Sequence, residues 1–152
     1  MQMPKPEQKE QVVNFYDQFA EKQQKTGINS RHLSILDKVK TAGLKENHRI
    51  LEVGCGIGTV SCLLATQVAE GAVLAVDISP ESIEKAKVLW KAQSNLKFEV
   101  SDMSDFDKGG EKFDFFVFPD VLEHIPVEQH DRLFQNISKH SHSDSVIFIH
   151  IP

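Results

Sequence analysis

The sequence predicts an α/β protein in which two N-terminal helices precede a doubly wound, mostly parallel sheet of about five strands. Two observations support this prediction. From residue 49 onward, short apolar runs alternate with helical stretches of about ten to sixteen residues, which is typical of βαβ units. A glycine-rich loop, residues 54–58, directly follows the first apolar run, and such sheets bind ligands at the carboxyl ends of their strands.

Two amphipathic helices are expected before the sheet. Residues 7–25 repeat apolar side chains three or four positions apart, which gives a helix one apolar face, and Gly27 follows it. The pair Asn29-Ser30 is suited to cap a second helix, which is expected to end near Gly43.

The elements of the sheet follow in order. Each expected strand is a short apolar run, and each expected helix lies between two such runs. The helix that begins at Pro80 has the clearest start, because Ser79 is suited to cap it and Glu81 lies near the positive end of its dipole. The expected strands are 49–53, 72–76, 96–100, 113–118 and 145–149, and the expected helices are 58–69, 80–93 and 127–140.

Composition limits the classes of function. The 152 residues suit a single domain, with residues 1–45 as a helical cap and residues 46–152 as the core. The net charge of -5 offers no bulk positive surface to nucleic acid, and no apolar stretch is long enough to span a membrane. Cys55 and Cys62 form neither a disulfide framework nor a zinc pattern. We therefore expect a soluble, cytoplasmic protein without nucleic-acid or membrane partners.

The glycine loop indicates a nucleotide-like ligand. Alternate glycines leave room for a ligand against the backbone, and the following helix offers free amide groups. Thr59 stands where a dinucleotide-binding loop has its third glycine, and the lysine of a triphosphate-binding loop is absent. Asp77 comes nineteen residues after Gly58, where a carboxylate accepts the hydroxyl protons of a ribose. Glu52, two residues before Gly54, suits a cofactor with a cationic amino group and disfavours a pyrophosphate.

Four motifs in this order resemble those of the class I S-adenosylmethionine-dependent methyltransferases, over about residues 49–150. They are Glu52-Val-Gly-Cys-Gly-Ile-Gly58, Val76-Asp77-Ile78-Ser79, Ser101-Asp102-Met103 and the stretch from Phe113 to Pro126. The resemblance implies a Rossmann-like fold. It also implies that S-adenosyl-L-methionine is the methyl donor and S-adenosyl-L-homocysteine the product.

The resemblance further implies which residues bind the cofactor. The glycine backbones would surround its amino acid end, Asp77 would hold the ribose hydroxyls, and Asp102 would accept from the adenine amino group. The complete implied set is Glu52, Gly54, Cys55, Gly56, Gly58, Asp77, Ile78, Asp102, Met103, Pro119 and Tyr16, the last in a segment that resembles the lid of small-molecule methyltransferases. Simpler structural roles stay open: Asp77 as a helix cap, Asp102 as a solvated loop acid, and Tyr16 as part of a packed helix face.

The residues after the fourth strand bear on the chemistry. Methyl transfer from a sulfonium mainly requires that the protein position the acceptor, exclude water and, where needed, take a proton. The imidazole of His124 is suited to take that proton, and a structural role for the Glu123-His124 turn is the alternative. The pattern D-x-x-E-H, formed by Asp120, Glu123 and His124, is similar to the metal-binding E-x-x-E-H of the small-RNA 2'-O-methyltransferases. Helical spacing would place these three side chains on one face, but we assign no metal site. His150, after the fifth apolar run, would point toward the mouth of the cleft.

The chain departs from the family pattern after the fifth strand. Class I methyltransferases have two further strands in an antiparallel hairpin, and this C-terminal hairpin is lacking. An uncovered apolar strand can pair with another chain, so we expect either a fragment of a longer protein or self-association through the sheet edge.

The favoured function is methyl transfer to an oxygen or nitrogen of a small molecule. The alternatives are a non-catalytic or partner-dependent S-adenosylmethionine-binding module and an NAD-dependent oxidoreductase, which Glu52 and Thr59 disfavour.

Overall fold

The sheet is parallel and doubly wound. A computed structural model describes residues 6–152, except for the side chains at positions 6, 16, 18, 19 and 21–26. In this part of the chain the strand order is β3-β2-β1-β4-β5, so the order reverses between β1 and β4. The strands are β1 (Arg49–Val53), β2 (Ala72–Asp77), β3 (Leu96–Val100), β4 (Phe115–Pro119) and β5 (Val146–His150). This arrangement confirms the predicted fold class.

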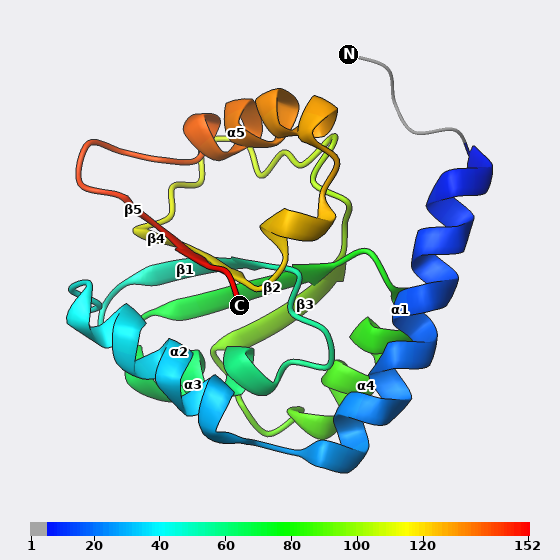
Figure 1. Ribbon diagram of the computed structural model, residues 1–152. Coiled ribbons are helices and arrows are strands. Elements are labelled where there is room, and N and C mark those ends of the chain that lie inside the picture. The colour runs from blue at the N-terminus through cyan, green and yellow to red at the C-terminus, as the bar shows by residue number, and fades with distance from the viewer. Residues whose placement is uncertain (1–5) are drawn as a thin grey trace.

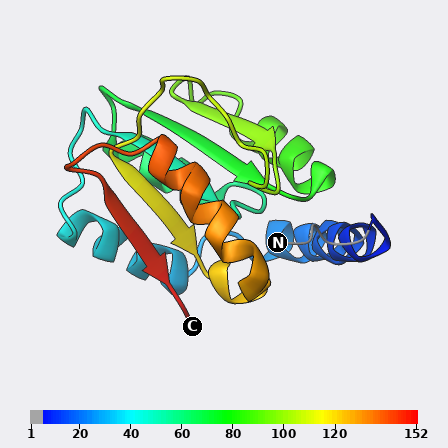
Figure 2. The same ribbon diagram turned by 90° about the horizontal axis from the view of Figure 1, so that it is seen from above.

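Helices cover both faces of the sheet. In Figures 1 and 2, α2, α3 and α4 lie on one face and α5 on the other, while α1 runs beside α4. Two short 3₁₀ helices, η1 and η2, connect β4 to α5. The bounds are α1 (Pro6–Thr26), α2 (Ser30–Thr41), α3 (Thr59–Gln67), α4 (Pro80–Leu89), η1 (Leu122–His124), η2 (Val127–Gln129) and α5 (His130–Lys139).

Each central strand contributes to two apolar cores, because successive side chains of a strand point to opposite faces. In β1, Ile50 packs with Leu64 of α3, whereas Leu51 packs with Leu133 and Ile137 of α5. A sheet that is covered on both faces needs apolar residues at nearly every central position, which is why the strands appear as continuous apolar runs. Glu52 interrupts this pattern, since its side chain is fully buried within the β1 run.

Several element bounds differ from the expected ones. Strand β4 begins at Phe115 rather than at residue 113 and extends to Pro119. Phe113 is buried before the strand begins, where its N–H donates to the His140 carbonyl at 2.8 Å. The helix expected at 127–140 is divided into η2 and a shorter α5, and α4 ends at Leu89 rather than at residue 93.

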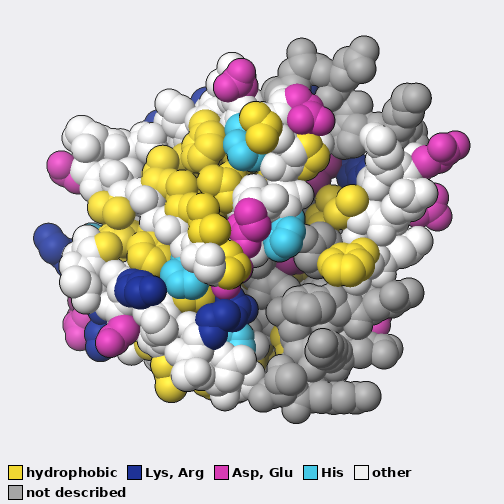
Figure 3. Space-filling model, in the orientation of Figure 1, with side chains coloured by type: hydrophobic (Ala, Val, Ile, Leu, Met, Phe, Trp, Pro, Cys, Tyr) yellow, Lys and Arg dark blue, Asp and Glu magenta, His cyan; other side chains and the backbone are white. Residues whose placement is uncertain are grey.

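Strand β5 forms one edge of the sheet and carries exposed apolar side chains. Ile147, Ile149 and Ile151 are 45%, 41% and 60% exposed. Figure 3 shows apolar side chains gathered on the face where β5 lies between α5 and α2. No helix in the described part of the chain has both the length and the apolar character needed to span a membrane.

Candidate functional site

The glycine loop (residues 54–58) connects β1 to α3 and is tied to the end of β2. Its three glycines have φ angles between 57° and 85°, which side-chain-bearing residues rarely adopt. The Gly54 N–H donates to the Val76 carbonyl at 2.8 Å. A Cβ on Gly54 would lie 2.3 Å from Val121 Cγ2, so the loop after β4 approaches the glycine loop as closely as only glycine permits.

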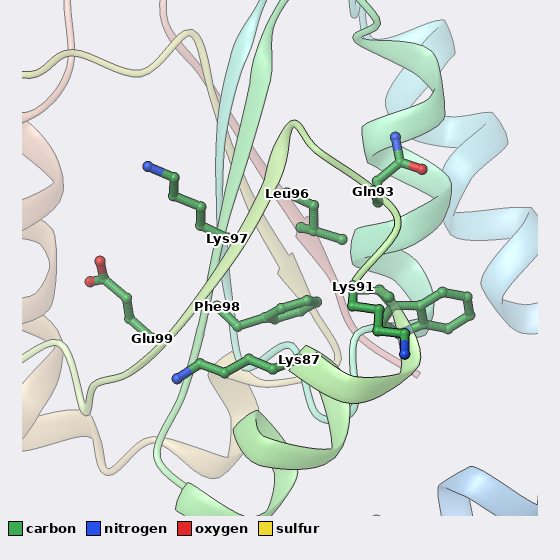
Figure 4. A pocket seen from close by; sticks show the side chains of 8 residues that line it. Lys87, Lys91, Gln93, Leu96, Lys97, Phe98 and Glu99 are labelled. Carbon is green, nitrogen blue, oxygen red and sulfur yellow. The ribbon is translucent and has the colours of Figure 1, made fainter.

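Two aromatic side chains support the back of the loop. A Cβ on Gly58 would lie 2.6 Å from Phe98 Cζ, and Trp90 Nε1–H donates to the Ile57 carbonyl at 2.8 Å. Beside them, at the outer edge of β3, is a surface hollow of about 300 Å³ (Figure 4). This hollow lies behind the loop and touches none of the predicted cofactor-binding residues; its lining is Lys87, Trp90, Lys91, Gln93, Leu96, Lys97, Phe98 and Glu99.

Asp77 lies at the carboxyl end of β2, directly against the loop. One carboxylate oxygen accepts the Gly56 N–H at 2.8 Å, and the other accepts the Ser79 N–H at 2.9 Å. Burial raises the pKa of Asp77, and the two amide donors oppose that rise. The carboxylate therefore stands where β2 and the glycine loop meet, and Ser79, rather than Asp77, caps α4 through its hydroxyl.

Glu52 lies beneath the loop and is fully buried. One carboxyl oxygen accepts from the Ser61 hydroxyl of α3, and the other, Oε2, has no hydrogen-bond partner among the described residues. Burial raises the pKa of Glu52 to about 8, and the Ser61 hydrogen bond opposes that rise. Burial, together with the nearby carboxyls of Glu52 and Asp77, also raises the pKa of the Cys55 thiol. A buried carboxyl with one free oxygen is suited to bind a cationic hydrogen-bond donor.

Asp102 follows β3 and already has several donors. Lys9 Nζ of α1 lies 2.5 Å from one carboxylate oxygen, while the backbone N–H and hydroxyl of Ser104 donate to the other at 3.0 and 2.7 Å. Although partial burial favours a higher pKa, these donors hold the pKa of Asp102 below its usual value. The neighbouring Met103 is buried at a positive φ of 65°, which turns the chain sharply after β3.

Helix α1 lies across the loops that follow β2 and β3. Besides the Lys9 contact, Asp17 accepts from the Ser79 hydroxyl and, at 3.3 Å, from the Glu81 N–H. The N-terminal helix thus contacts the region of two predicted cofactor-binding acids. The side chain of Tyr16, also predicted to contact the cofactor, lies outside the described part of the structure.

The end of β4 carries a cluster that joins three elements. Pro119 is buried, and Asp120 follows it with a positive φ of 55°. The Asp120 carboxylate accepts from the Arg31 guanidinium of α2 and lies 2.5 Å from His150 Nδ1 at the end of β5. His150 therefore lies at the carboxyl edge of the sheet.

His124 lies in η1, with its side chain 57% exposed and its Nε2 3.8 Å from Glu123 Oε1. Asp120 precedes η1 in a left-handed conformation, so the expectation that Asp120, Glu123 and His124 share one helix face is wrong. Within the described residues, no three histidine, cysteine, aspartate or glutamate side chains are grouped to hold a metal ion.

The structure thus brings Glu52, the glycine loop and Asp77 together, with Asp102 and Met103 at the end of the adjacent β3. Sequence patterns gave no indication of Lys9 or Arg31, and Asp17 was noted only as part of the lid-like segment that contains Tyr16. Their contacts join positions 93, 62 and 89 residues apart, and no local spacing marks such pairs.

Comparison with known proteins places this chain in a family. A family model for the methyltransferase domain matches residues 50–144. The ubiquinone biosynthesis O-methyltransferase of Coxiella burnetii is 34% identical over 72% of this chain and 44% of its own length. The ribosomal protein L11 methyltransferase of Thermotoga neapolitana is 30% identical over 70% of this chain and 38% of its own. This chain spans about two fifths of the length of these relatives.

Solved structures show the same fold. Phosphoethanolamine N-methyltransferase 1 of Haemonchus contortus, in complex with phosphoethanolamine and S-adenosylhomocysteine, matches 98% of this chain and 33% of its own, with a TM-score of 0.79 and 16% identity. PKMT2 of Rickettsia typhi, in complex with AdoHcy (S-adenosylhomocysteine), matches 70% of this chain and 21% of its own, with a TM-score of 0.64 and 26% identity. Because the family match covers more than half of the chain, this chain belongs to the methyltransferase domain family.

Proposed function

We propose that this chain is an S-adenosylmethionine-dependent methyltransferase domain. The observation that carries the proposal is the buried Glu52, whose free oxygen lies beneath a glycine loop that Asp77 also contacts. A cationic amino group near Glu52 and ribose hydroxyls near Asp77 are two features of this one cofactor. The family match and the S-adenosylhomocysteine bound to PKMT2 of Rickettsia typhi support the same cofactor. When bound, it supplies a methyl group activated by a sulfonium.

Different residues at the loop contact different parts of the cofactor. Asp77 accepts the ribose hydroxyl protons, which requires it to share or release the amide donors that it now has. Glu52 faces the amino group. Asp102 accepts from the adenine amino group, and Lys9 holds its carboxylate charged. The remaining proposed contacts come from the backbone of the three glycines and from Cys55, Ile78, Met103, Pro119 and Tyr16.

We propose that the acceptor is an oxygen or nitrogen of a small molecule. The ubiquinone biosynthesis O-methyltransferase among the relatives supports this class of acceptor. A protein acceptor is the second candidate, because another relative is a ribosomal protein L11 methyltransferase. His124, exposed in the turn after β4, is the proposed group that takes the acceptor's proton.

Two further proposals concern the cellular compartment and the association of two copies of the chain. Both cysteines are free thiols, which supports a reducing compartment such as the cytoplasm. The exposed edge of β5 offers unpaired backbone groups and apolar side chains, so we propose that two copies associate there.

Calorimetric titration tests the choice of cofactor. We expect S-adenosylhomocysteine to bind the chain and NAD not to bind, because Thr59 stands where a dinucleotide-binding loop has its third glycine and NAD has no cationic amino group to pair with Glu52. Binding of NAD without binding of S-adenosylhomocysteine would overturn the proposal. A screen with S-adenosylmethionine carrying a radiolabelled methyl group, against phenols, carboxylic acids, amines and purified L11, then separates turnover from binding alone and small-molecule acceptors from protein acceptors.

A further inference from the structure

Two histidine–aspartate pairs join β4 to β5, one at each end of these strands. At the amino ends, His142 Nε2 lies 2.8 Å from Asp114 Oδ1. At the carboxyl ends, His150 Nδ1 lies 2.5 Å from Asp120 Oδ1. Ligands bind doubly wound sheets at the carboxyl ends of the strands, so only the His150 pair lies on the edge that holds the proposed site.

Asp120 is held firmly in an unfavourable backbone conformation. Its φ of 55° is in the left-handed region, which is energetically costly for a residue with a side chain. Three contacts offset this cost: its N–H donates to the His150 carbonyl at 3.0 Å, and its two carboxylate oxygens accept from Arg31 and His150. With both oxygens engaged, the Asp120 side chain is fixed against the imidazole.

This contact determines which ring nitrogen of His150 carries a proton. A carboxylate only accepts hydrogen bonds, so the nitrogen that faces Asp120, Nδ1, must donate. In the neutral ring, Nε2 then has a lone pair, and none of the described residues forms a hydrogen bond with it. The side chain is 15% exposed, so Nε2 is shielded from bulk water without being fully enclosed.

We propose that His150, oriented by Asp120, is a second proton acceptor at the methyl-acceptor site, in addition to His124; this inference rests on the proposed function. The acceptor's heteroatom forms its bond to the methyl carbon, and the methyl–sulfur bond breaks with its electron pair left on sulfur. The acceptor's proton moves to His150 Nε2. Asp120 is a positioning residue, because its carboxylate orients the ring and stabilises the imidazolium that forms.

The test compares His150→Gln with His142→Gln in the full chain, using the acceptor that gives the highest turnover in the radiolabel screen. We expect His150→Gln to lower kcat by about 10²-fold, the usual contribution of a general base, with an unchanged Kd for S-adenosylhomocysteine. His142→Gln is the matched control, because it removes a histidine–aspartate pair from the opposite end of the same strands. It should leave kcat unchanged.

A second measurement does not depend on turnover. Long-range ¹H–¹⁵N NMR correlations distinguish the two neutral forms of imidazole, and we expect the proton of His150 on Nδ1 in the wild type and a shift toward the other form in Asp120→Asn. A proton on Nε2 in the wild type overturns the inference. Turnover by the wild type with an equal kcat in His150→Gln also overturns it and leaves the proposed function intact. Binding of S-adenosylhomocysteine with no methyl transfer to any acceptor contradicts the proposed function, and the inference with it.

Discussion

At the scale of single residues, Glu52 has a strongly perturbed electrostatic environment. Its side chain is fully buried, and only one of its two oxygens has a partner. Burial raises the pKa to about 8, so near neutral pH the carboxyl is mainly protonated in the absence of a cation. The cationic amino group of a bound cofactor would stabilise the charged form of Glu52. Binding of the cofactor is therefore linked to the ionisation of Glu52.

The raised pKa of Glu52 predicts how stability changes with pH. A carboxyl that keeps its proton more tightly when folded stabilises the protein fully below its usual pKa of 4.5, and this contribution is lost as the pH rises through about 8. We expect the free energy of unfolding to fall between these pH values by a few kcal/mol, since one pKa unit corresponds to about 1.4 kcal/mol. Glu52→Gln should lack this component.

Urea denaturation at a series of pH values measures the effect. Glu46→Gln is the matched control, because Glu46 is exposed and its substitution should leave the slope unchanged. Equal slopes in the wild type and in Glu52→Gln would show that the buried carboxyl is not the source.

The residues that the structure brings together at the glycine loop were predictable from the sequence where the signal was local. Glu52 and the glycines lie within seven positions of one another, and Asp77 follows the next apolar run. The cationic partners of Asp102 and Asp120 were not predictable in this way. Lys9 reaches Asp102 and Arg31 reaches Asp120 from the N-terminal helices, and such ion pairs depend on how α1 and α2 pack against the sheet.

At the scale of elements, α2 begins with an unusual capping box. The Asn29 side chain accepts from the backbone of Arg31 and His32, and the His32 ring accepts in return from the Asn29 N–H at 3.1 Å. An accepting nitrogen cannot carry a proton, so this cap requires a neutral imidazole. Burial and the neighbouring Arg31 both lower the pKa of His32, whereas Asp120 opposes them.

The capping box should therefore weaken in acid. Because the folded-state pKa of His32 lies below its usual value of 6.5, its stabilising effect is present above that pH and is lost as the pH falls through the lowered pKa. We expect a loss of about 1 kcal/mol, the usual contribution of a helix cap. His32→Gln keeps an acceptor that does not titrate, so the difference between the two unfolding curves should grow below pH 6.5. A constant difference from pH 7 to pH 5 would contradict this role.

The elements themselves were largely predictable, because their signals are periodicity and caps. The bounds of β1 and β3 agree with the apolar runs. Phe113 was assigned to β4 because an apolar residue beside a strand looks the same whether it pairs in the sheet or packs before it. The left-handed turn at Asp120 was not predicted, because aspartate adopts this conformation only occasionally and its presence alone does not mark one.

At the scale of the whole molecule, the two edges of the sheet differ. The β3 edge alternates apolar side chains with Lys97 and Glu99, and charges on an edge strand oppose pairing with another sheet. The β5 edge has no charged side chain between Val146 and Ile149 and exposes Ile147 and Ile149. Association of two copies is therefore expected at β5.

Sedimentation velocity over a range of concentrations tests this expectation. Ile149→Lys places a charge on the β5 edge and should shift the protein toward monomer. Val88→Lys is the control, because Val88 is 69% exposed on α4, far from that edge in the strand order. A wild type that stays monomeric at high concentration would contradict association at β5.

The glycine loop, Asp77 and Glu52 converge at one place in the fold. Their proposed role as a cofactor site is most directly tested by the affinity of Asp77→Asn for S-adenosylhomocysteine. Hydrogen bonds to a charged group contribute about 1.5–3 kcal/mol, so calorimetry should show binding weakened by about tenfold or more. Asp37→Asn, at an exposed position of α2, should bind as the wild type does. An unchanged Kd in a folded Asp77→Asn protein would contradict the assignment of the ribose to this carboxylate.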